Sequence, residues 1–333
     1  MPNLSTSPDI TACPRAAAVV LLVLCIACTD DRTGPTSAAD LPADPVSAPV
    51  ESTDLPAAIL DTRSSRPGIV FGSISMPNSY LDQVHTGWMT GGPLDPSNIL
   101  SHLSGARAKG GRVVIKLCKG KDQYVKNGDG TFSLTKWKSL VSSYRNVNLD
   151  PYISDGTIIG HYLIDEPHRA QRWGGKVISQ ATLEAMAQHS KELWPQMTTI
   201  VRVEPSHLAS ASLTYKYLDA GWTQYRATKG DAAKWVAAEA AAANRKGLGL
   251  VVGLNVLDGG NGSSKIRGAT SGKWAMSASE IRNYGYAMIG PSLACGFFNW
   301  THDPQYYGRS DIRSAMADVS AKARSHAKTS CRQ

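Results

Sequence analysis

From residue 68 onward, short apolar runs alternate with segments in which apolar residues recur at helical spacing. The apolar runs are rich in Val, Ile and Leu, and this is typical of strands buried on both faces of a parallel sheet. Seven runs are clear and a weaker one lies around residues 85–89. The clear runs are residues 68–74, 112–118, 157–164, 198–203, 221–225, 248–256 and 294–300.

Helical segments separate most of these runs. They are residues 95–108, 134–144, 180–193, 230–245, 279–288 and 310–326. Strands that alternate with helices over about 265 residues predict a single (β/α)8 TIM-barrel domain over residues 67–333. An open doubly wound sheet is the alternative. Its nucleotide-binding form has no support, because neither G-x-G-x-x-G after the first strand nor G-x-x-x-x-G-K-[ST] occurs.

Residues 1–28 have the pattern of a signal peptide. A polar stretch ends at Arg15, and the apolar residues 16–27 that follow are too few to span a bilayer. Leu-Cys-Ile-Ala-Cys at residues 24–28 resembles a bacterial lipoprotein signal, although Cys25 stands where a small or aliphatic residue is usual. The resemblance implies a lipid anchor on Cys28, with ordinary secretion as the alternative, and a place in the bacterial cell envelope.

Residues 29–66 are rich in Pro, Ser and Asp and show no strand or helix period, so we expect a disordered tether. The whole chain carries a formal charge of +8, and residues 67–333 alone hold 31 Lys and Arg against 19 Asp and Glu. A basic surface can attract polyanions, but a solvated surface is the simpler interpretation. Only net charge points to nucleic acid, so we expect no nucleic-acid partner. We also expect the protein to be a monomer.

The cysteines of the barrel have two different predicted roles. Cys295 begins the last strand and Cys331 follows the last helix, so both belong at the amino-terminal end of the barrel. A disulfide between them is plausible in an oxidising envelope. Cys118 follows another strand, and we expect it to be a buried filler.

Polar residues follow nearly every predicted strand, where TIM barrels place their chemistry. The most informative segment is Gly-His-Tyr-Leu-Ile-Asp-Glu-Pro-His at residues 160–168, where two carboxylates end an apolar strand. Adjacent side chains on a strand alternate in direction, so Asp165 and Glu166 share one space only if the strand end bends. The other candidates at strand ends are Lys116, His168, Arg202, Glu204, Gln224, Asn255, Asp258, Asn299, Trp300 and His302.

Two of these strand ends resemble those of TIM-barrel glycoside hydrolases of the large retaining clan. Ile-Asp-Glu-Pro at residues 164–167 is similar to the Asn-Glu-Pro end of their fourth strand, and Phe-Phe-Asn-Trp at residues 297–300 to their eighth. The resemblance implies that Glu166 is the acid/base and Trp300 a platform under the sugar ring. Asp165 departs from the family's Asn, and the seventh strand lacks the family's nucleophilic glutamate.

The second carboxylate is therefore open between Glu204 and Asp258. Its separation from Glu166 would decide the stereochemistry, with about 5 Å typical of retention and about 6.5–9.5 Å of inversion. We expect a carbohydrate substrate, contacted by the polar strand-end residues named above, and no cofactor. Lys116 and Arg202 would suit an acidic sugar.

Three other interpretations remain open. The missing seventh-strand glutamate favours a surface lipoprotein that binds glycan without cleaving it. A metal-dependent hydrolase would use His168, His207, His302, Asp258 and Asp303, which lack tight ligand spacing. In a purely structural interpretation, Asp165 and Glu166 bind Arg202 and Lys116 on neighbouring strands.

Overall fold

The computed structural model describes residues 68–92, 94–328 and 330–332. The predicted signal peptide, the anchor at Cys28 and the tether lie outside the described residues. No helix in the described part of the chain is both long and apolar enough to cross a membrane.

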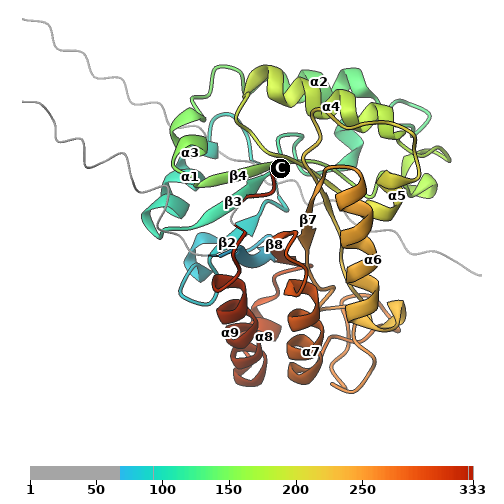
Figure 1. Ribbon diagram of the computed structural model, residues 1–333. Helices are drawn as coiled ribbons and strands as arrows, with labels where there is room; N and C mark the ends of the chain where they lie inside the picture. Colours follow the sequence, from blue (N-terminus) through green and yellow to red (C-terminus); the bar gives the residue numbers. More distant parts are fainter. Residues whose placement is uncertain (1–67, 93, 329, 333) are drawn as a thin grey trace, which may run out of the picture. The chain divides into compact units, whose positions relative to one another are not determined.

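Eight parallel strands close into a barrel in chain order (Figure 1). They are β1 Val70–Ile74, β2 Gly87–Met89, β3 Arg112–Ile115, β4 Ile158–Asp165, β5 Thr199–Arg202, β6 Ala220–Trp222, β7 Gly249–Val252 and β8 Ala294–Asn299. Direct pairing of β1 with β8 closes the sheet. The predicted TIM barrel is confirmed, and the weak run around residues 85–89 supplies β2.

Helices surround the barrel (Figure 1). They are α1 Ile99–Ala108, α2 Leu134–Ser142, α3 Asp150–Ser154, α4 Gln180–Leu193, α5 Pro205–Ala209, α6 Ala232–Arg245, α7 Ala278–Ile289, α8 Pro304–Tyr307 and α9 Ser310–Arg324. Only a 3-10 turn, Asn78–Tyr80, connects β1 to β2, and only the short α5 connects β5 to β6. The long predicted helices are present, with ends shifted by a few residues.

Polar caps explain where several of these helices begin. The side chains of Ser133, Ser179 and Asp231 each accept a hydrogen bond from a backbone N–H in the first turn of α2, α4 and α6. Ser277 and Glu280 form a reciprocal capping box at the start of α7. Such caps satisfy N–H groups that have no partner within the helix, which fixes the helix start.

The apolar core has two layers. The outer layer lies between the strands and helices, and the inner one fills the barrel. Inside the barrel, Tyr162 and Trp222 meet edge to face with ring centroids 5.7 Å apart. Both rings are almost fully buried, so they form an aromatic layer beneath the polar strand ends.

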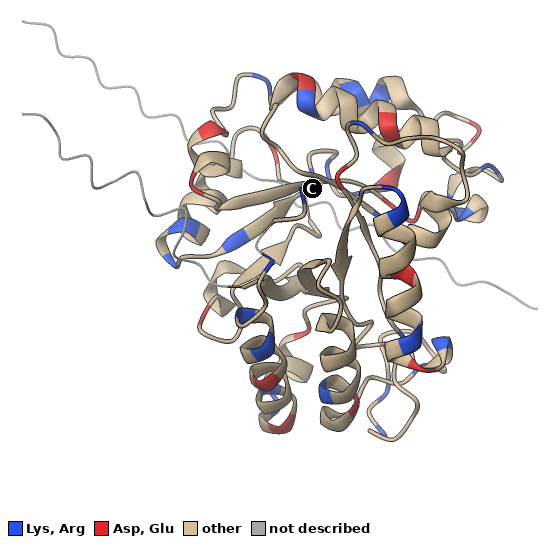
Figure 2. Cartoon of the chain, viewed as in Figure 1, with Lys and Arg blue, Asp and Glu red and all other residues tan. Residues whose placement is uncertain are grey.

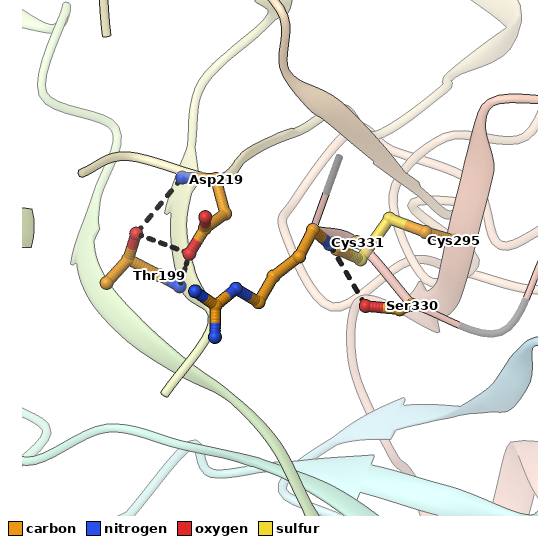
Figure 3. The surroundings of a disulfide bond; sticks show 6 residues. Thr199, Asp219, Cys295, Ser330 and Cys331 are labelled. Carbon is orange, nitrogen blue, oxygen red and sulfur yellow. Dashed lines mark hydrogen bonds between the residues drawn. A yellow bond between two sulfur atoms is a disulfide. The ribbon is translucent and has the colours of Figure 1, made fainter. Parts of the chain in front are cut away.

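The amino-terminal end of the barrel is closed by the carboxy-terminal tail. Cys295 at the start of β8 forms a disulfide with Cys331, as predicted, with their Cα atoms 5.0 Å apart (Figure 3). A Cβ added at Gly249 would lie 2.4 Å from the carbonyl oxygen of Cys331, so only glycine lets the tail pass this close to β7. Cys118 is reduced and buried, as expected.

Charged side chains are dispersed over the domain. In the view of Figure 2, Lys and Arg lie on several helices and loops, interspersed with Asp and Glu. This distribution fits the solvated-surface interpretation of the positive net charge better than a single basic face.

The disulfide gives a test of how much the tail stabilises the barrel. The bond spans a sequence separation of 36 residues. The chain-entropy model gives about 3–4 kcal/mol for a loop of this size, so the Cys295→Ser/Cys331→Ser variant should lose stability of that order. Urea unfolding measures the loss. Dithiothreitol should destabilise the wild type and leave the double variant unchanged; equal effects on both would contradict this role.

Candidate functional site

The end of β4 bends at the two carboxylates. Asp165 is the last residue of β4, and Glu166 has a φ of 46°, in the left-handed region. This conformation interrupts the alternation of side chains along the strand. The strand end thus has the bend that Asp165 and Glu166 need to share one space, and both carboxylates face the same arginines.

Arginine side chains contact every carboxylate oxygen of this pair. Arg202 on β5 lies 2.6 Å from Asp165 Oδ1 and 3.0 Å from Glu166 Oε1. Arg172, in the loop after β4, lies 2.6 Å from Asp165 Oδ2 and 3.1 Å from Glu166 Oε2. Arg169 adds a contact of 3.1 Å to Glu166 Oε1. The pair is thus held in an ion cluster, as the structural interpretation predicted for Arg202.

The cluster continues to the loop after β3. Arg172 donates to Asp122 through Nε and Nη2, with the Nη2–Oδ1 distance 3.0 Å. Burial alone would raise the pKa of Asp165, but Arg202 and Arg172 hold it well below the ordinary value of 3.8. Asp165 therefore stays ionised at neutral pH and is unsuited to be a proton donor.

Lys116 does not take the place in the cluster that the structural interpretation gave it. Its Nζ lies 5.4 Å from the centroid of the Tyr162 ring and 3.5 Å from the carbonyl oxygen of Gly120. Arg172, which sequence reasoning missed, contacts the carboxylates in its stead. Lys116 is only 5% exposed, so a buried cation remains at this end of the barrel.

A small cavity of about 30 Å³ lies beside the cluster, at the ends of β4, β5 and β6. Glu166 and Glu204 both line it, so Glu204 is the candidate second carboxylate that the structure brings to Glu166. The other lining residues are His168, Arg169, Arg202, Val203, Trp222, Gln224 and Arg226. This cavity is a shallow hollow that is partly open to solvent.

The titratable groups beside Glu166 have shifted pKa values. Burial raises the pKa of Glu204, but its backbone N–H and Lys229, whose Nζ is 3.2 Å away, bring it below the ordinary value. Burial lowers the pKa of His168, against the opposing charges of Glu204 and Glu166. Glu204 is therefore ionised and His168 neutral at pH 7.

The structure does not bring Asp258 to this cavity. Its carboxylate accepts hydrogen bonds from the backbone N–H and the hydroxyl of Thr270, at 2.9 and 2.6 Å. The side chain of Asn255 accepts the backbone N–H of Asp258 at 3.0 Å. Both residues thus shape the long loop after β7.

The residues predicted at the end of β8 lie in different surroundings. Asn299 is fully buried, and its Oδ1 accepts the backbone N–H of Leu254 at 3.3 Å. Trp300 is partly buried against the outer core layer. His302 packs against Tyr80, with ring centroids 4.2 Å apart. None of the three lines the small cavity.

A larger cavity of about 300 Å³ lies at the ends of β1 and β2. Met76, Trp88 and Leu94 give it an apolar wall, and Asn78 and His102 add polar groups. Trp88 is held in place by a hydrogen bond from its indole N–H to Asn78 Oδ1, at 2.6 Å. Sequence reasoning did not single out this cavity, because its residues come from β2, α1 and two loops and share no motif.

The residues proposed for a metal site do not come together as a set of ligands in the described part of the chain. Within residues 68–92, 94–328 and 330–332, no group of three or more His, Cys, Asp or Glu side chains is placed to hold a metal ion. His168 and His207 pack together with ring centroids 5.6 Å apart.

Comparison with solved structures relates this barrel to glycoside hydrolases. An endo-1,4-β-mannanase from Rhizomucor miehei superposes with a TM-score of 0.52 and 13% identity, covering 78% of this chain and 95% of its own. The β-glucanase SdGluc5_26A from Saccharophagus degradans, solved with cellotetraose, gives 0.57 and 10% identity, covering 78% and 88%. A family 5 mannosidase from Rhizomucor miehei gives 0.50 and 9%, covering 78% and 94%.

No protein-family model matches the sequence. No curated protein matches it either. The domain therefore has a TIM-barrel fold like that of glycoside hydrolases, which confirms the resemblance at the level of fold.

The lowered pKa of Asp165 predicts acid sensitivity. This carboxyl group is ionised more readily in the folded than in the unfolded state. Its contribution to the free energy of unfolding is therefore fully present above the unfolded pKa and is lost as the pH falls towards the folded pKa. From about pH 6 to about pH 3 this group should remove about 1 kcal/mol of unfolding free energy. Urea unfolding of Asp165→Asn should show a correspondingly weaker pH dependence than the wild type.

Asp318→Asn is the matched control, since Asp318 forms an exposed ion pair with Arg282. It should keep the pH dependence of the wild type, because exposed pairs contribute little. If the unfolding free energy of Asp165→Asn depended on pH as strongly as that of the wild type, Asp165 would not be the source of the acid sensitivity.

Proposed function

We propose that the carboxyl-terminal end of this barrel binds a carbohydrate chain without cleaving it. The glycoside hydrolase-like fold supports a carbohydrate ligand, and solved neighbours include a complex with cellotetraose. The site comprises the ion cluster of Asp122, Asp165, Glu166, Arg172 and Arg202, the small cavity beside it and the aromatic residue Trp300.

One observation carries the choice of binding over cleavage: guanidinium groups contact both oxygens of Glu166. A general acid must present a protonated oxygen to the glycosidic oxygen of the substrate. Arg202, Arg172 and Arg169 engage both oxygens of Glu166, so a substrate would have to compete with them for this carboxylate. The lowered pKa values of Asp165 and Glu204 leave those two carboxylates equally unsuited to donate a proton.

We further propose that the domain acts in the bacterial cell envelope as a monomer. The signal pattern before Cys28 and the acidic tether of residues 29–66 support a lipid anchor, with secretion as the alternative. The Cys295–Cys331 disulfide fits an oxidising compartment.

Hydrolysis is the second candidate, favoured by the cavity that Glu166 and Glu204 share. In that case the substrate displaces an arginine from Glu166, which then acts as acid/base, and Glu204 attacks the sugar or activates water.

A glycan panel tested with the wild type and Glu166→Gln separates the two candidates. Binding is measured by calorimetry, and cleavage by release of reducing ends. We expect the wild type to bind at least one glycan without cleaving it, and Glu166→Gln to retain that binding. Glu192→Gln is the control, because Glu192 is an exposed glutamate on α4.

Cleavage by the wild type that falls by about a hundredfold or more in Glu166→Gln would establish the second candidate instead. Absence of binding to every glycan would defeat both.

Trp300 is the proposed sugar platform within this site. Trp300→Ala should weaken glycan binding by about tenfold, the effect of losing an aromatic anchor. Unchanged affinity, with the fold intact by circular dichroism, would remove Trp300 from the site.

A further inference from the structure

The small cavity is lined by nitrogen donors that lack acceptors. Five side-chain nitrogens of its lining residues have no hydrogen-bond partner among the described residues. Four of them are donors, namely Arg202 Nε, Trp222 Nε1, Gln224 Nε2 and Arg226 Nε, and the fifth, His168 Nδ1, donates or accepts according to its tautomer. Gln224 is 6% exposed and Trp222 1%, so bulk water does not readily satisfy these groups. A buried donor without an acceptor is costly, and a set of four in one place points to a ligand that supplies oxygens.

The charge around this cavity favours an anionic ligand. The two carboxylates that line it are already paired, Glu166 with Arg169 and Arg202, and Glu204 with Lys229. Arg226 lines the same cavity and forms no ion pair with any described residue. An unpaired guanidinium beside neutral donors suits an acceptor-only group, because a hydroxyl would also need an acceptor for its own proton.

The size of the cavity favours a small anionic group. The hollow is small and partly open, so it suits an anionic substituent of a sugar rather than the whole ring. A carboxylate is the smallest acceptor-only group of this kind. The aromatic layer also limits the depth, since Arg202 lies over the Trp222 ring with its Cζ 5.5 Å from the centroid.

We infer that this cavity holds a carboxylate group, bound by Arg226, Gln224 and Trp222. This inference rests on the proposed function for the source of that carboxylate: the ligand is a glycan containing uronic acid. The sugar ring then lies outside the cavity, in the mouth of the barrel, and only its carboxylate enters. Lys116, buried at the same end of the barrel, adds to the positive potential that attracts the acidic chain.

Calorimetry with oligogalacturonide, oligoglucuronide and alginate oligomers tests this inference, with the methyl ester of each as its neutral counterpart. We expect at least one acid form to bind and its ester to bind about tenfold more weakly or worse, the value of a charge-assisted hydrogen bond. Arg226→Gln should weaken binding of the acid form by a similar factor and leave binding of the ester unchanged. Arg226→Lys should retain part of the affinity.

Arg282→Gln is the matched control, because Arg282 pairs with Asp318 between α7 and α9. It should bind the acid form as the wild type does. Thermal unfolding of each variant shows whether the fold is intact, and Arg226→Lys keeps the test informative if Arg226→Gln is unstable.

A second readout uses acetate as the smallest carboxylate probe. The indole N–H signal of Trp222 in a proton–nitrogen NMR spectrum should shift with acetate in the wild type and much less in Arg226→Gln.

The outcomes separate the inference from the proposed function. Equal binding of acids and esters, without an acetate response, would overturn the carboxylate site and leave glycan binding intact. An acetate response that depends on Arg226, without binding of any glycan, would support the carboxylate site and defeat the proposed function. Absence of both signals would overturn both.

Discussion

The arrangement of this end of the barrel depends on one interaction, the pairing of the two carboxylates after β4 with Arg202 and Arg172. Asp165 and Glu166 are adjacent like charges that would repel each other if left alone. The guanidinium groups join them to β5 and, through Asp122, to the loop after β3. Loss of one partner from a partly buried cluster of this kind is destabilising, since the remaining charges would be desolvated without full compensation.

This pairing decides which polar groups remain available to a ligand. The carboxylate oxygens are engaged, whereas Arg202 Nε, Gln224 Nε2 and Trp222 Nε1 are not. A site first recognised by its carboxylates therefore offers mainly hydrogen-bond donors. Its chemistry is closer to that of an anion-binding pocket than to that of a pair of acids sharing a sugar.

The fold could be predicted from the sequence because it depends on periodic signals. Val, Ile and Leu runs define the strands, helical spacing defines the helices, and the direction of each element places Cys295 and Cys331 at the same end. The ion cluster lacked such a signal. Asp122 and Arg172 are 50 residues apart in two loops, and nothing local to either residue predicts their contact. Glu166 adopts a left-handed conformation that glutamate rarely takes. The sequence therefore indicated that a bend would be needed to bring the two carboxylates together, but it did not predict the bend itself.

The barrel shares its fold with glycoside hydrolases, yet fold alone does not carry their chemistry. A pair of catalytic carboxylates must stand across a gap that admits the sugar bond. Here the end of β7 supplies Asn255, whose oxygen accepts the N–H of Asp258, while Asp258 itself binds Thr270. The polar groups of this strand end are thus used to shape a loop. Hydrolysis at Glu166 would require Glu204 to replace a β7 carboxylate and an arginine to leave Glu166, and each change removes an ion pair that the resting structure contains.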